Sequence, residues 1–445
     1  MSFAEDHPTV RAVRRRTSPA PPETLDADWL RQIASDSGAD DVAFVSLDAP
    51  GLEEEARHLR AAFPVAHTLI SFVVRMNRES VRSPARSIAN RTFHDAGERA
   101  QHTADRIARA LEDLGVRALH PSMAFPMEMD NFPGRTWVIS HKRVAEAAGL
   151  GKMGVHRNLI HPRFGNFVLL GTVAVDRPIS EGARALDYTP CLGCNLCVSA
   201  CPVGAVKPGG GFDFQACYTH NYREFMGGFL DVLGEIADAK DRDDLATRLP
   251  VSEGVSLWQS LTYGANYKAA YCMAVCPAGE DVIAPFLDDR RGYVKQIVQP
   301  LREKAEPVFV IRGSDAADHV QRRYPHKQPR FVRSTIQPQN IDGFLRFAHI
   351  AFQPRKSKDV TLRLHFTFTG ASDRAATIDI RDRGIQVEDG HIGERDAHVT
   401  VDATTWLGIV SGRANPVWAV IRGKLKVNGP ISVMKTFQGC FAGAS

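Results

Sequence analysis

The sequence lacks the features of a membrane-spanning protein, a secreted scaffold or a nucleic-acid-binding protein. Although 44% of its residues are hydrophobic, it has no run of the about 18 apolar residues that a spanning helix needs. The arginines near the N-terminus are followed by prolines and acidic residues, not by the apolar stretch of a secretion signal. The net charge is only +4, so charge predicts no nucleic-acid binding. We therefore expect a cytoplasmic protein.

Cysteine is scarce, with 8 in 445 residues, yet it is concentrated in one segment. A secreted scaffold distributes its disulfide partners along the chain, so this clustering argues against disulfides. Cys440 lies far from the rest, and we interpret it as a small buried apolar side chain. The others are Cys191, Cys194, Cys197, Cys201, Cys217, Cys272 and Cys276.

The spacing of these cysteines indicates iron-sulfur clusters. A thiol at every third residue, followed by a Cys-Pro pair, is typical of two-cluster ferredoxins, where the cysteine before proline ligates the other cluster. The chain repeats this ending at Cys272-x-x-x-Cys276-Pro277, whereas a zinc site normally uses two pairs. If the cysteine before proline in each motif ligates the cluster of the other motif, one 4Fe-4S cluster is expected on Cys191, Cys194, Cys197 and Cys276. A second cluster is then expected on Cys201, Cys217 and Cys272.

The second predicted cluster has an irregular ligand set. A complete motif would place a cysteine three residues before Cys272, where the chain has Ala269. The second centre is therefore a 3Fe-4S cluster, or a 4Fe-4S cluster with a non-cysteine ligand such as His220 or Asn266. With one thiolate fewer, its reduction potential is expected to differ from that of its neighbour.

The N-terminal part alternates helical and strand patterns. Apolar residues at helical spacing over 25–37 stop at Gly38, a helix C-cap residue. Short β-rich runs follow at 40–47 and 67–74, and a helix is expected over 97–114. These elements predict an α/β sandwich of helices over a sheet.

Gly149, Gly151 and Gly154 form a G-x-G-x-x-G pattern. A dinucleotide fingerprint needs a strand before the glycines and a helix after them, but here the order is reversed. The pattern is then either a helix C-cap with its turn, or a place where the backbone approaches a flat group.

Beyond residue 337 the sequence alternates apolar and polar residues between turns, which predicts a separate domain with an antiparallel sheet. The stretch before it is dense in Pro, Arg and charge, as linkers are. We divide the chain into a disordered tail (1–24), an α/β domain (25–187), a cluster module (188–300), a linker (301–336) and a C-terminal domain (337–445).

The motifs "AGLGKMG", "NLIHPRFGNFVLLGTV", "CLGCNLCVSACPVGAV", "ACYTH" and "CMAVCP" occur in this order and resemble those of epoxyqueuosine reductases and corrinoid reductive dehalogenases, over roughly 25–285. The resemblance implies an α/β (α+β) fold: a nitroreductase-like sandwich with an inserted two-cluster ferredoxin module. It implies a ferredoxin or flavodoxin as electron donor and cobalamin as cofactor. The corrin would contact Gly149, Gly151, Gly154, His156 and Asn158.

The chain departs from this family at the catalytic position. The family's catalytic aspartate precedes the glycine turn by a fixed interval, and the corresponding residue here is Arg135. The resemblance therefore implies a reductase with a different substrate. The candidate proton donors are Arg135, His141, His156 and Tyr271, and His141 is preferred because imidazole releases a proton near neutral pH.

Residues 337–443 resemble the sterol carrier protein type 2 domain, with "GKLKVNG" as a shared hairpin. The resemblance implies an α+β sterol-carrier-like domain around an apolar tunnel, and a small apolar or lipid-like substrate for the enzyme. Two alternatives stay open: an iron-sulfur and lipid-binding adaptor without a corrinoid, and a flavin-dependent reductase. The aromatic residues expected at the tunnel are Phe344, Phe347, Phe352, Phe366, Trp406 and Trp418.

Overall fold

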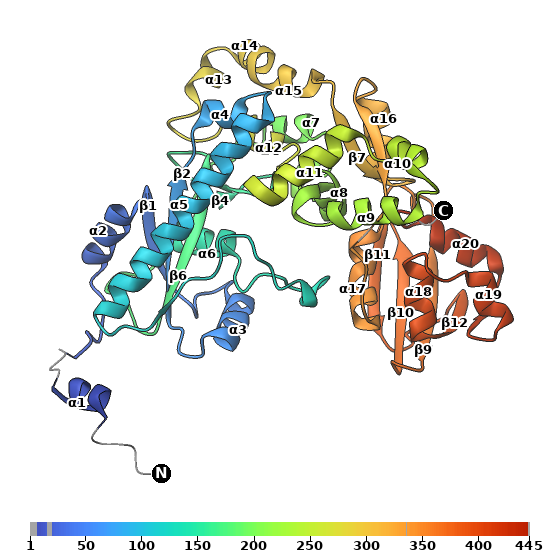
Figure 1. Ribbon diagram of the computed structural model, residues 1–445, viewed down its shortest axis with the longest axis horizontal. Coiled ribbons are helices and arrows are strands. Elements are labelled where there is room, and N and C mark those ends of the chain that lie inside the picture. Colours follow the sequence, from blue (N-terminus) through green and yellow to red (C-terminus); the bar gives the residue numbers. More distant parts are fainter. Residues whose placement is uncertain (1–6, 16–19, 335, 444–445) are drawn as a thin grey trace.

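The computed structural model describes residues 7–15, 20–334 and 336–443. Its N-terminal domain and C-terminal domain lie on either side, with the cysteine-containing region joining them at the top (Figure 1). Within the described part of the chain, no helix combines the length and apolar character needed to cross a bilayer. Of the tail that we expected to be disordered, Pro8–Arg15 forms helix α1 without buried residues, and 1–6 and 16–19 lie outside the described residues.

The N-terminal domain is an antiparallel sheet with helices on both faces, which confirms the predicted sandwich. Ile70 and Phe72 of strand β2 pack toward α2 and α5, whereas Leu69 packs toward α3 and α6. Neighbouring strand residues point to opposite faces, so a strand covered on both sides is apolar throughout. In sheet order the strands are β1 (Asp41–Ser46), β2 (Thr68–Arg75), β6 (Val168–Val175) and β3 (Ala118–Leu119).

The helices of this domain follow the expected caps. Helix α2 ends at Gly38, whose φ of 111° is a left-handed conformation that suits glycine. Helix α6 ends in the same way at Gly149, and the chain then reaches strand β6, so the glycine pattern lies between a helix and a strand as expected. The helices are α2 (Ala27–Ser37), α3 (Glu53–Ala62), α4 (Arg78–Arg82), α5 (Arg86–Asp113), η1 (Met129–Asn131) and α6 (His141–Ala148), with small strands β4 (Lys152–Met153) and β5 (Leu159–Ile160).

The cysteine-containing region is built from short helices. Helices α9, α10 and α11 form the polar helical insertion that the sequence predicted near 231–249, extended to residue 263. The elements are α7 (Leu196–Ala200), η2 (Pro208–Gly210), α8 (Phe214–His220), η3 (Arg223–Phe225), α9 (Gly228–Asp238), α10 (Arg242–Arg248), α11 (Val251–Tyr263), α12 (Tyr271–Ala274), α13 (Ala284–Asp288), α14 (Arg290–Tyr293), η4 (Val294–Val298) and α15 (Gln299–Glu303).

The segment that we expected to be a linker, 301–336, is instead a packed strand–helix–strand unit. Strands β7 (Pro307–Ile311) and β8 (Gln328–Val332) pair in parallel, and helix α16 (Asp315–Arg323) connects them. Val308, Val310 and Val320 are buried in one apolar core with Cys197 and Cys201. The Pro and Arg content that suggested a linker lies at the ends of these elements, and five-residue strands leave only a weak periodic signal.

The C-terminal domain has a five-stranded sheet in the order β11-β10-β9-β12-β13. We expected an antiparallel sheet, but β9 and β12 are parallel because the chain crosses back after β11 to lie beside β9. The elements are α17 (Ile341–Ala351), β9 (Leu362–Thr369), β10 (Arg374–Arg381), β11 (Gly384–Asp389), β12 (Ala397–Asp402), α18 (Ala403–Val410), α19 (Pro416–Ile421), β13 (Leu425–Asn428) and α20 (Ile431–Gly439).

The aromatic residues expected at a tunnel divide into two groups. The rings of Phe344, Phe366 and Trp406 pack against one another with centroids 5.2–6.4 Å apart, inside the core of the domain. Trp418 is 58% exposed, so the expectation that it lines an interior wall is wrong. It lies on α19, which buries only Ala419.

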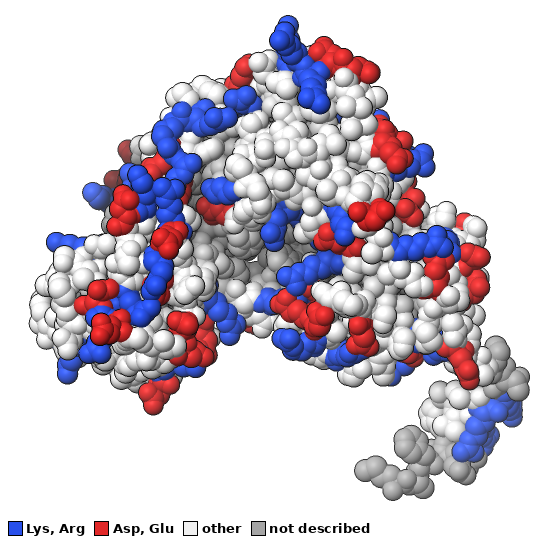
Figure 2. Space-filling model, turned by 180° about the vertical axis from the view of Figure 1, so that it is seen from behind, with Lys and Arg blue, Asp and Glu red and all other residues white. Residues whose placement is uncertain are grey.

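The N-terminal and C-terminal domains touch through one extended loop. Phe132 packs against Phe347 of α17 with ring centroids 6.3 Å apart, and Gly134 lies beside the guanidinium of Arg346. Figure 1 shows this loop reaching from the N-terminal domain toward α17. Seen from behind, the molecule is hollowed near its centre, and both basic and acidic side chains border the hollow (Figure 2).

Candidate iron-sulfur site

Four of the cysteines line a small open hollow at the surface. The loop before α7 turns through left-handed conformations at Gly193 (φ 62°) and Asn195 (φ 58°), which brings its successive thiols to one side. His156 and Pro277 also line the hollow, and Cys194 is exposed. The cysteines brought together here are Cys191, Cys194, Cys197 and Cys276.

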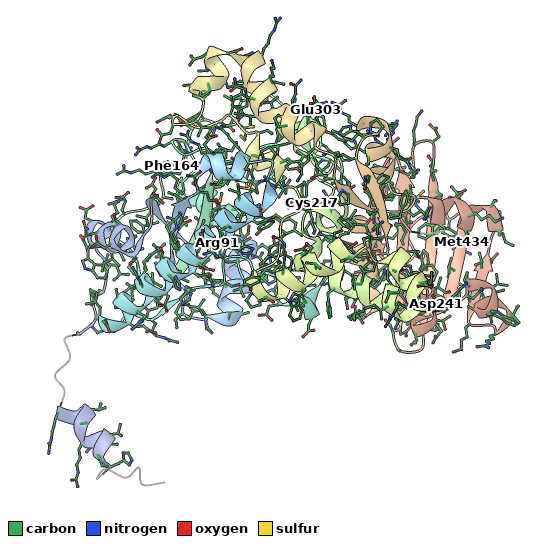
Figure 3. The ribbon with its side chains drawn as sticks, turned by 45° about the horizontal axis from the view of Figure 1, so that its top comes forward. Arg91, Phe164, Cys217, Asp241, Glu303 and Met434 are labelled. Atoms are coloured by element: carbon green, nitrogen blue, oxygen red, sulfur yellow. The ribbon has the colours of Figure 1, made fainter. Side chains whose placement is uncertain are left out.

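The remaining three cysteines of the segment form a second set, which we call the deeper set; Cys201 is buried, and Cys217 and Cys272 are half-buried. Burial, with a smaller contribution from the nearby Cys201, raises the pKa of the Cys272 thiol to about 12. The pKa of Cys217 is raised by burial and then by Cys201 and Cys272, so these three thiols are mutual neighbours. They come from α7, α8 and α12, and Figure 3 shows Cys217 in the middle of the molecule.

The two sets are adjacent. The pKa of Cys197 is raised to about 12, mainly by burial, and the second-largest contribution to this increase comes from Cys272 of the deeper set. In the described ranges no three His, Cys, Asp or Glu side chains converge closely enough to chelate one ion. A cluster has a different requirement, because each of its irons takes one thiolate at a separate corner. Buried thiols with raised pKa values lose their protons only to a strongly positive partner such as iron.

No fourth cysteine accompanies the deeper set. The Oδ1 atom of Asn221 accepts hydrogen bonds from the backbone amides of Ala269 (3.1 Å) and Ala270 (2.7 Å), which fixes the loop where a cysteine was expected. Of the two alternative ligands, Asn266 donates to the Glu224 carboxylate at 2.9 Å. His220 accepts from the Phe309 amide at 3.4 Å through Nδ1, while its buried Nε2 atom has no partner among the described residues.

Two cations accompany the deeper cysteines. The Lys142 ammonium donates to the Arg157 carbonyl (2.9 Å) and to Asn158 Oδ1 (2.8 Å). Burial lowers the pKa of Lys142, while Cys272 and Cys217 act in the opposite direction. A proton on this partly buried group is therefore held less tightly than on an exposed lysine.

Arg86 is the second cation. Its Nη1 atom donates to the carbonyls of Val81 (3.1 Å) and Ser83 (3.0 Å). Among the described residues no group pairs with its buried Nε and Nη2 atoms. Burial lowers the pKa of Arg86, and Tyr271, Glu306 and Cys272 oppose that effect. A buried cation with unused donors beside a thiol favours negative charge there.

His141, the preferred proton donor, is held inside the N-terminal domain. Its Nε2 atom donates to the Ser122 carbonyl at 2.9 Å, and its Nδ1 atom accepts from the Thr172 hydroxyl at 2.8 Å. Burial lowers its pKa, so the ring is neutral and its only N–H is already used. These contacts do not favour His141 as a proton donor.

Arg135 and Tyr271 are also engaged elsewhere. The Arg135 guanidinium forms an ion pair with the fully buried Glu55, whose carboxylate also accepts from the Ser140 amide at 2.8 Å. The Tyr271 hydroxyl contacts both oxygens of Glu306 at 2.9 and 2.7 Å, and burial followed by that carboxylate raises its pKa. The contact of Arg135 with Glu55 and that of Tyr271 with Glu306 each hold together two segments that are far apart in the sequence.

The residues expected along a corrin do not form an open cradle. A Cβ atom on Gly149 would lie 1.8 Å from the Arg184 carbonyl oxygen, and one on Gly151 would lie 2.4 Å from that of Ile160. One on Gly154 would meet Ile160 and His156. The chain itself thus fills the space beside all three glycines. Close packing within the chain therefore explains the three glycines, and they do not by themselves indicate a corrin.

His156 and Asn158 complete the turn. His156 Nδ1 accepts from the Asn158 amide at 3.1 Å, and its Nε2 atom lies 3.1 Å from the side-chain nitrogen of Asn166. Burial lowers the pKa of His156 to about 4, so the ring is neutral near pH 7. The turn therefore joins the cysteine hollow, which His156 lines, to Lys142, which Asn158 binds.

Lys142, Arg86 and Asn221 were not among the residues that the sequence singled out. Lys142 and Arg86 belong to no motif, and their role depends on contacts with segments far along the chain. Asn221 carries a weak signal, because it follows the "ACYTH" motif directly.

Cys440 lies far from both sets. It is fully buried in the C-terminal domain, and its Sγ donates to the Thr436 carbonyl at 3.3 Å.

The fold and the cysteine sets define an iron-sulfur protein with an appended α+β domain. Residues 185–207 match the 4Fe-4S binding domain family, and residues 351–442 match the SCP-2 sterol transfer family. The chain is therefore a fusion of an iron-sulfur part similar to epoxyqueuosine reductases and an SCP-2-type domain, as the sequence predicted.

The curated relatives are epoxyqueuosine reductases. The Bacillus cereus protein is 35% identical over 187 residues, which are 40% of this chain and 42% of that protein. The Listeria monocytogenes protein is 30% identical over 142 residues, 32% of this chain and 30% of that protein. The chain thus spans less than half the length of these relatives.

Among solved structures, the epoxyqueuosine reductase from Streptococcus thermophilus is 16% identical, with a TM-score of 0.35 over 60% of this chain and 83% of that one. A B12-dependent reductive dehalogenase is 15% identical, with a TM-score of 0.40 over 68% of this chain and 38% of that one.

Proposed function

We propose that the protein is an iron-sulfur reductase of the epoxyqueuosine reductase type, in which two clusters pass electrons to a substrate bound beside the deeper cluster. The observation that carries this proposal is the adjacency of the two cysteine sets, because Cys197 and Cys201 are buried in one apolar core and Cys217 and Cys272 pack against it. Adjacent clusters allow electrons to move from one to the other without leaving the protein.

The exposure of the two sets gives the direction of electron flow. Cys194 is exposed and Leu192, which lines the same hollow, is 46% exposed, so a ferredoxin or flavodoxin can approach the first cluster. Cys217 and Cys272 lie deeper, beside Lys142 of the N-terminal domain. Electrons therefore enter at the surface cluster and leave from the deeper one.

Lys142 is the proton donor that we propose in place of His141, Arg135 and Tyr271. It is partly buried, its pKa is lowered by burial, and it lies near the deeper cysteines. General acid catalysis requires a group that can give up its proton near the working pH. Asn158 and the Arg157 carbonyl hold the ammonium in place.

The favoured substrate is a modified nucleoside carried on RNA. The curated relatives are named for epoxyqueuosine, and Lys and Arg are among the side chains that border the central hollow of Figure 2, where they can contact phosphates. Reduction of an epoxide to an alkene takes up two electrons and two protons and releases water. Two one-electron clusters hold such an electron pair. This proposal differs from our expectation, based on net charge, of no nucleic-acid partner.

A small apolar substrate is the second candidate. It is favoured by the loop that joins the N-terminal domain to α17 through Phe132 and Phe347, because this contact brings the SCP-2-type domain against the N-terminal domain. Because the glycine turn does not form a corrin cradle, we assign no step to cobalamin.

The test uses anaerobically purified protein, a chemically reduced ferredoxin and tRNA containing epoxyqueuosine. Nucleoside analysis is expected to show queuosine, and the variant Cys272→Ser should abolish its formation while Cys440→Ser should not. Conversion of an apolar epoxide but not of the tRNA would select the second candidate. Iron-loaded protein that reduces neither would overturn the proposal and leave an electron-transfer adaptor.

A further inference from the structure

The C-terminal domain has a helix with exposed apolar side chains, in a segment whose charged residues are all of one sign. On α19 the side chains of Val417, Trp418, Val420 and Ile421 are 52–65% exposed, and only Ala419 is buried. Exposed apolar side chains in a continuous group indicate a binding surface, whereas scattered ones do not. We call Val417, Trp418, Val420 and Ile421, together with the cations around them, the α19 surface.

The charged side chains of the segment that contains this helix are all cations. Residues 403–445 contain no Asp or Glu. Asp402, which lies near Lys424, is engaged by the Thr405 amide and hydroxyl as the N-cap of α18. The cations of the segment, all exposed, are Arg413, Arg422, Lys424, Lys426 and Lys435.

The short turn after α19 keeps cations and apolar groups together. The Gly423 amide donates to the Val420 carbonyl at 2.9 Å, and the Lys424 amide donates to the Ala419 carbonyl at 2.9 Å. Arg422 and Lys424 therefore lie at the end of the exposed helix. Helix α20 adds Ile431, which is 73% exposed, and lies at the same outer edge of the domain (Figure 1).

We propose that the α19 surface docks the protein on anionic lipid bilayers. A helix at a bilayer surface buries apolar side chains at the boundary of the acyl chains, while lysine and arginine contact acidic head groups. Tryptophan prefers that boundary, because its ring is apolar and its N–H is polar. The α19 surface supplies all three components on one short element.

The composition favours lipid over RNA as the partner. RNA-binding surfaces stack bases on aromatic and arginine side chains and use cations for the phosphates. Val417, Val420 and Ile421 are aliphatic and offer no stacking face. Helix α11 provides a contrast within the same chain, because its exposed Trp258 and Leu261 have only an acidic residue, Glu253, within the helix.

The test is flotation of the full-length iron-loaded chain with vesicles of phosphatidylcholine alone or mixed with phosphatidylglycerol. We expect binding to the anionic vesicles only, with at least about tenfold weaker partition after raising the salt from 0.1 M to 0.5 M, as screening requires. Tryptophan emission should shift to shorter wavelength on binding.

Two pairs of variants separate the contributions. Trp418→Ser with Ile421→Ser should lower binding about tenfold or more, and Trp258→Ser with Leu261→Ser on α11 should not. Arg422→Glu with Lys424→Glu should likewise reduce binding, whereas Arg57→Glu on α3 should not. All changed residues are exposed, and unchanged circular dichroism and iron content would show that the variants fold.

Several outcomes would overturn the proposal. Equal binding to neutral vesicles would show that charge has no role, and no binding to either would exclude the lipid surface. Loss of RNA affinity in the charge variants without vesicle binding would assign α19 to RNA. A concentration-dependent dimer lost in the serine variants, again without vesicle binding, would assign it to a second copy of the chain.

Discussion

Arg86 and Tyr271 are stacked in the interior, with the guanidinium carbon 5.3 Å from the centre of the ring. The residue after Tyr271 is Cys272, so this contact holds a buried cation beside the deeper cysteine set. Reduction adds negative charge to a cluster, and a nearby cation stabilises the reduced form. Arg86 is therefore expected to raise the reduction potential of the deeper cluster.

Replacing Arg86 with Met should lower that potential. The change removes a buried charge, and we expect a shift of roughly 50 mV or more toward negative values. Redox titration followed by electron paramagnetic resonance measures the two clusters separately. The control is Arg91→Met on the exposed surface of α5, where Arg91 pairs with Asp95 (Figure 3). A potential that is equal in both variants would show that Arg86 has no influence on the cluster.

Ala269 marks the missing thiol of the deeper set. If that cluster contains three irons, the oxidised protein should give an isotropic resonance signal. Ala269→Cys should abolish that signal by supplying the fourth thiolate, because each iron of a four-iron cluster takes one cysteine. Ala269 is buried in the core against which Cys272 packs, so the thiol of the introduced cysteine would lie near the deeper cysteine set. A spectrum unchanged by the substitution would contradict our ligand assignment.

Sequence reasoning succeeded where the signal is local. The buried strand β2 and the caps at Gly38 and Gly149 follow from patterns within ten residues. The cysteine motif likewise predicted an iron-sulfur segment, which the match over residues 185–207 supports.

It failed where the deciding contacts join distant segments. The sequence suggested that the His141 imidazole is available for proton transfer, but both of its nitrogens form hydrogen bonds, with Thr172 and Ser122. The sequence placed Arg135 at the catalytic position, but its guanidinium forms an ion pair with Glu55, 80 residues earlier. The incorrect prediction of a linker over 301–336 has the same reason. Strands β7 and β8 are stabilised by pairing with each other and by burial against the cysteine-containing core.

Lys327 and Glu306 form a buried ion pair at 2.7 Å behind Tyr271. Burial lowers the pKa of Lys327 and Glu306 raises it, while Lys327 lowers the pKa of Glu306 against the effect of burial. Lys327→Met leaves the carboxylate without its main cation and should cost about 3 kcal/mol in the free energy of unfolding. Adding Glu306→Gln should recover part of the loss, since it removes the carboxylate that Lys327→Met leaves without its main cation. Urea unfolding of both variants tests this, and equal stabilities of wild type and Lys327→Met would refute the role of the pair.

His220 should make the protein less stable in mild acid. Burial lowers its pKa from 6.5 to about 4, so between these values the unfolded chain binds a proton that the folded chain does not. The free energy of unfolding then falls as the pH falls, by up to about 1.4 kcal/mol per pH unit from this one group, and is unaffected by it above 6.5. His220→Gln removes the titration, so the difference in stability between wild type and variant should shrink as the pH falls from 7.5 to 5. Urea unfolding at each pH measures it, with the exposed His7 changed to Gln as the control. A difference that stays constant across this range would show that His220 is not held neutral by burial.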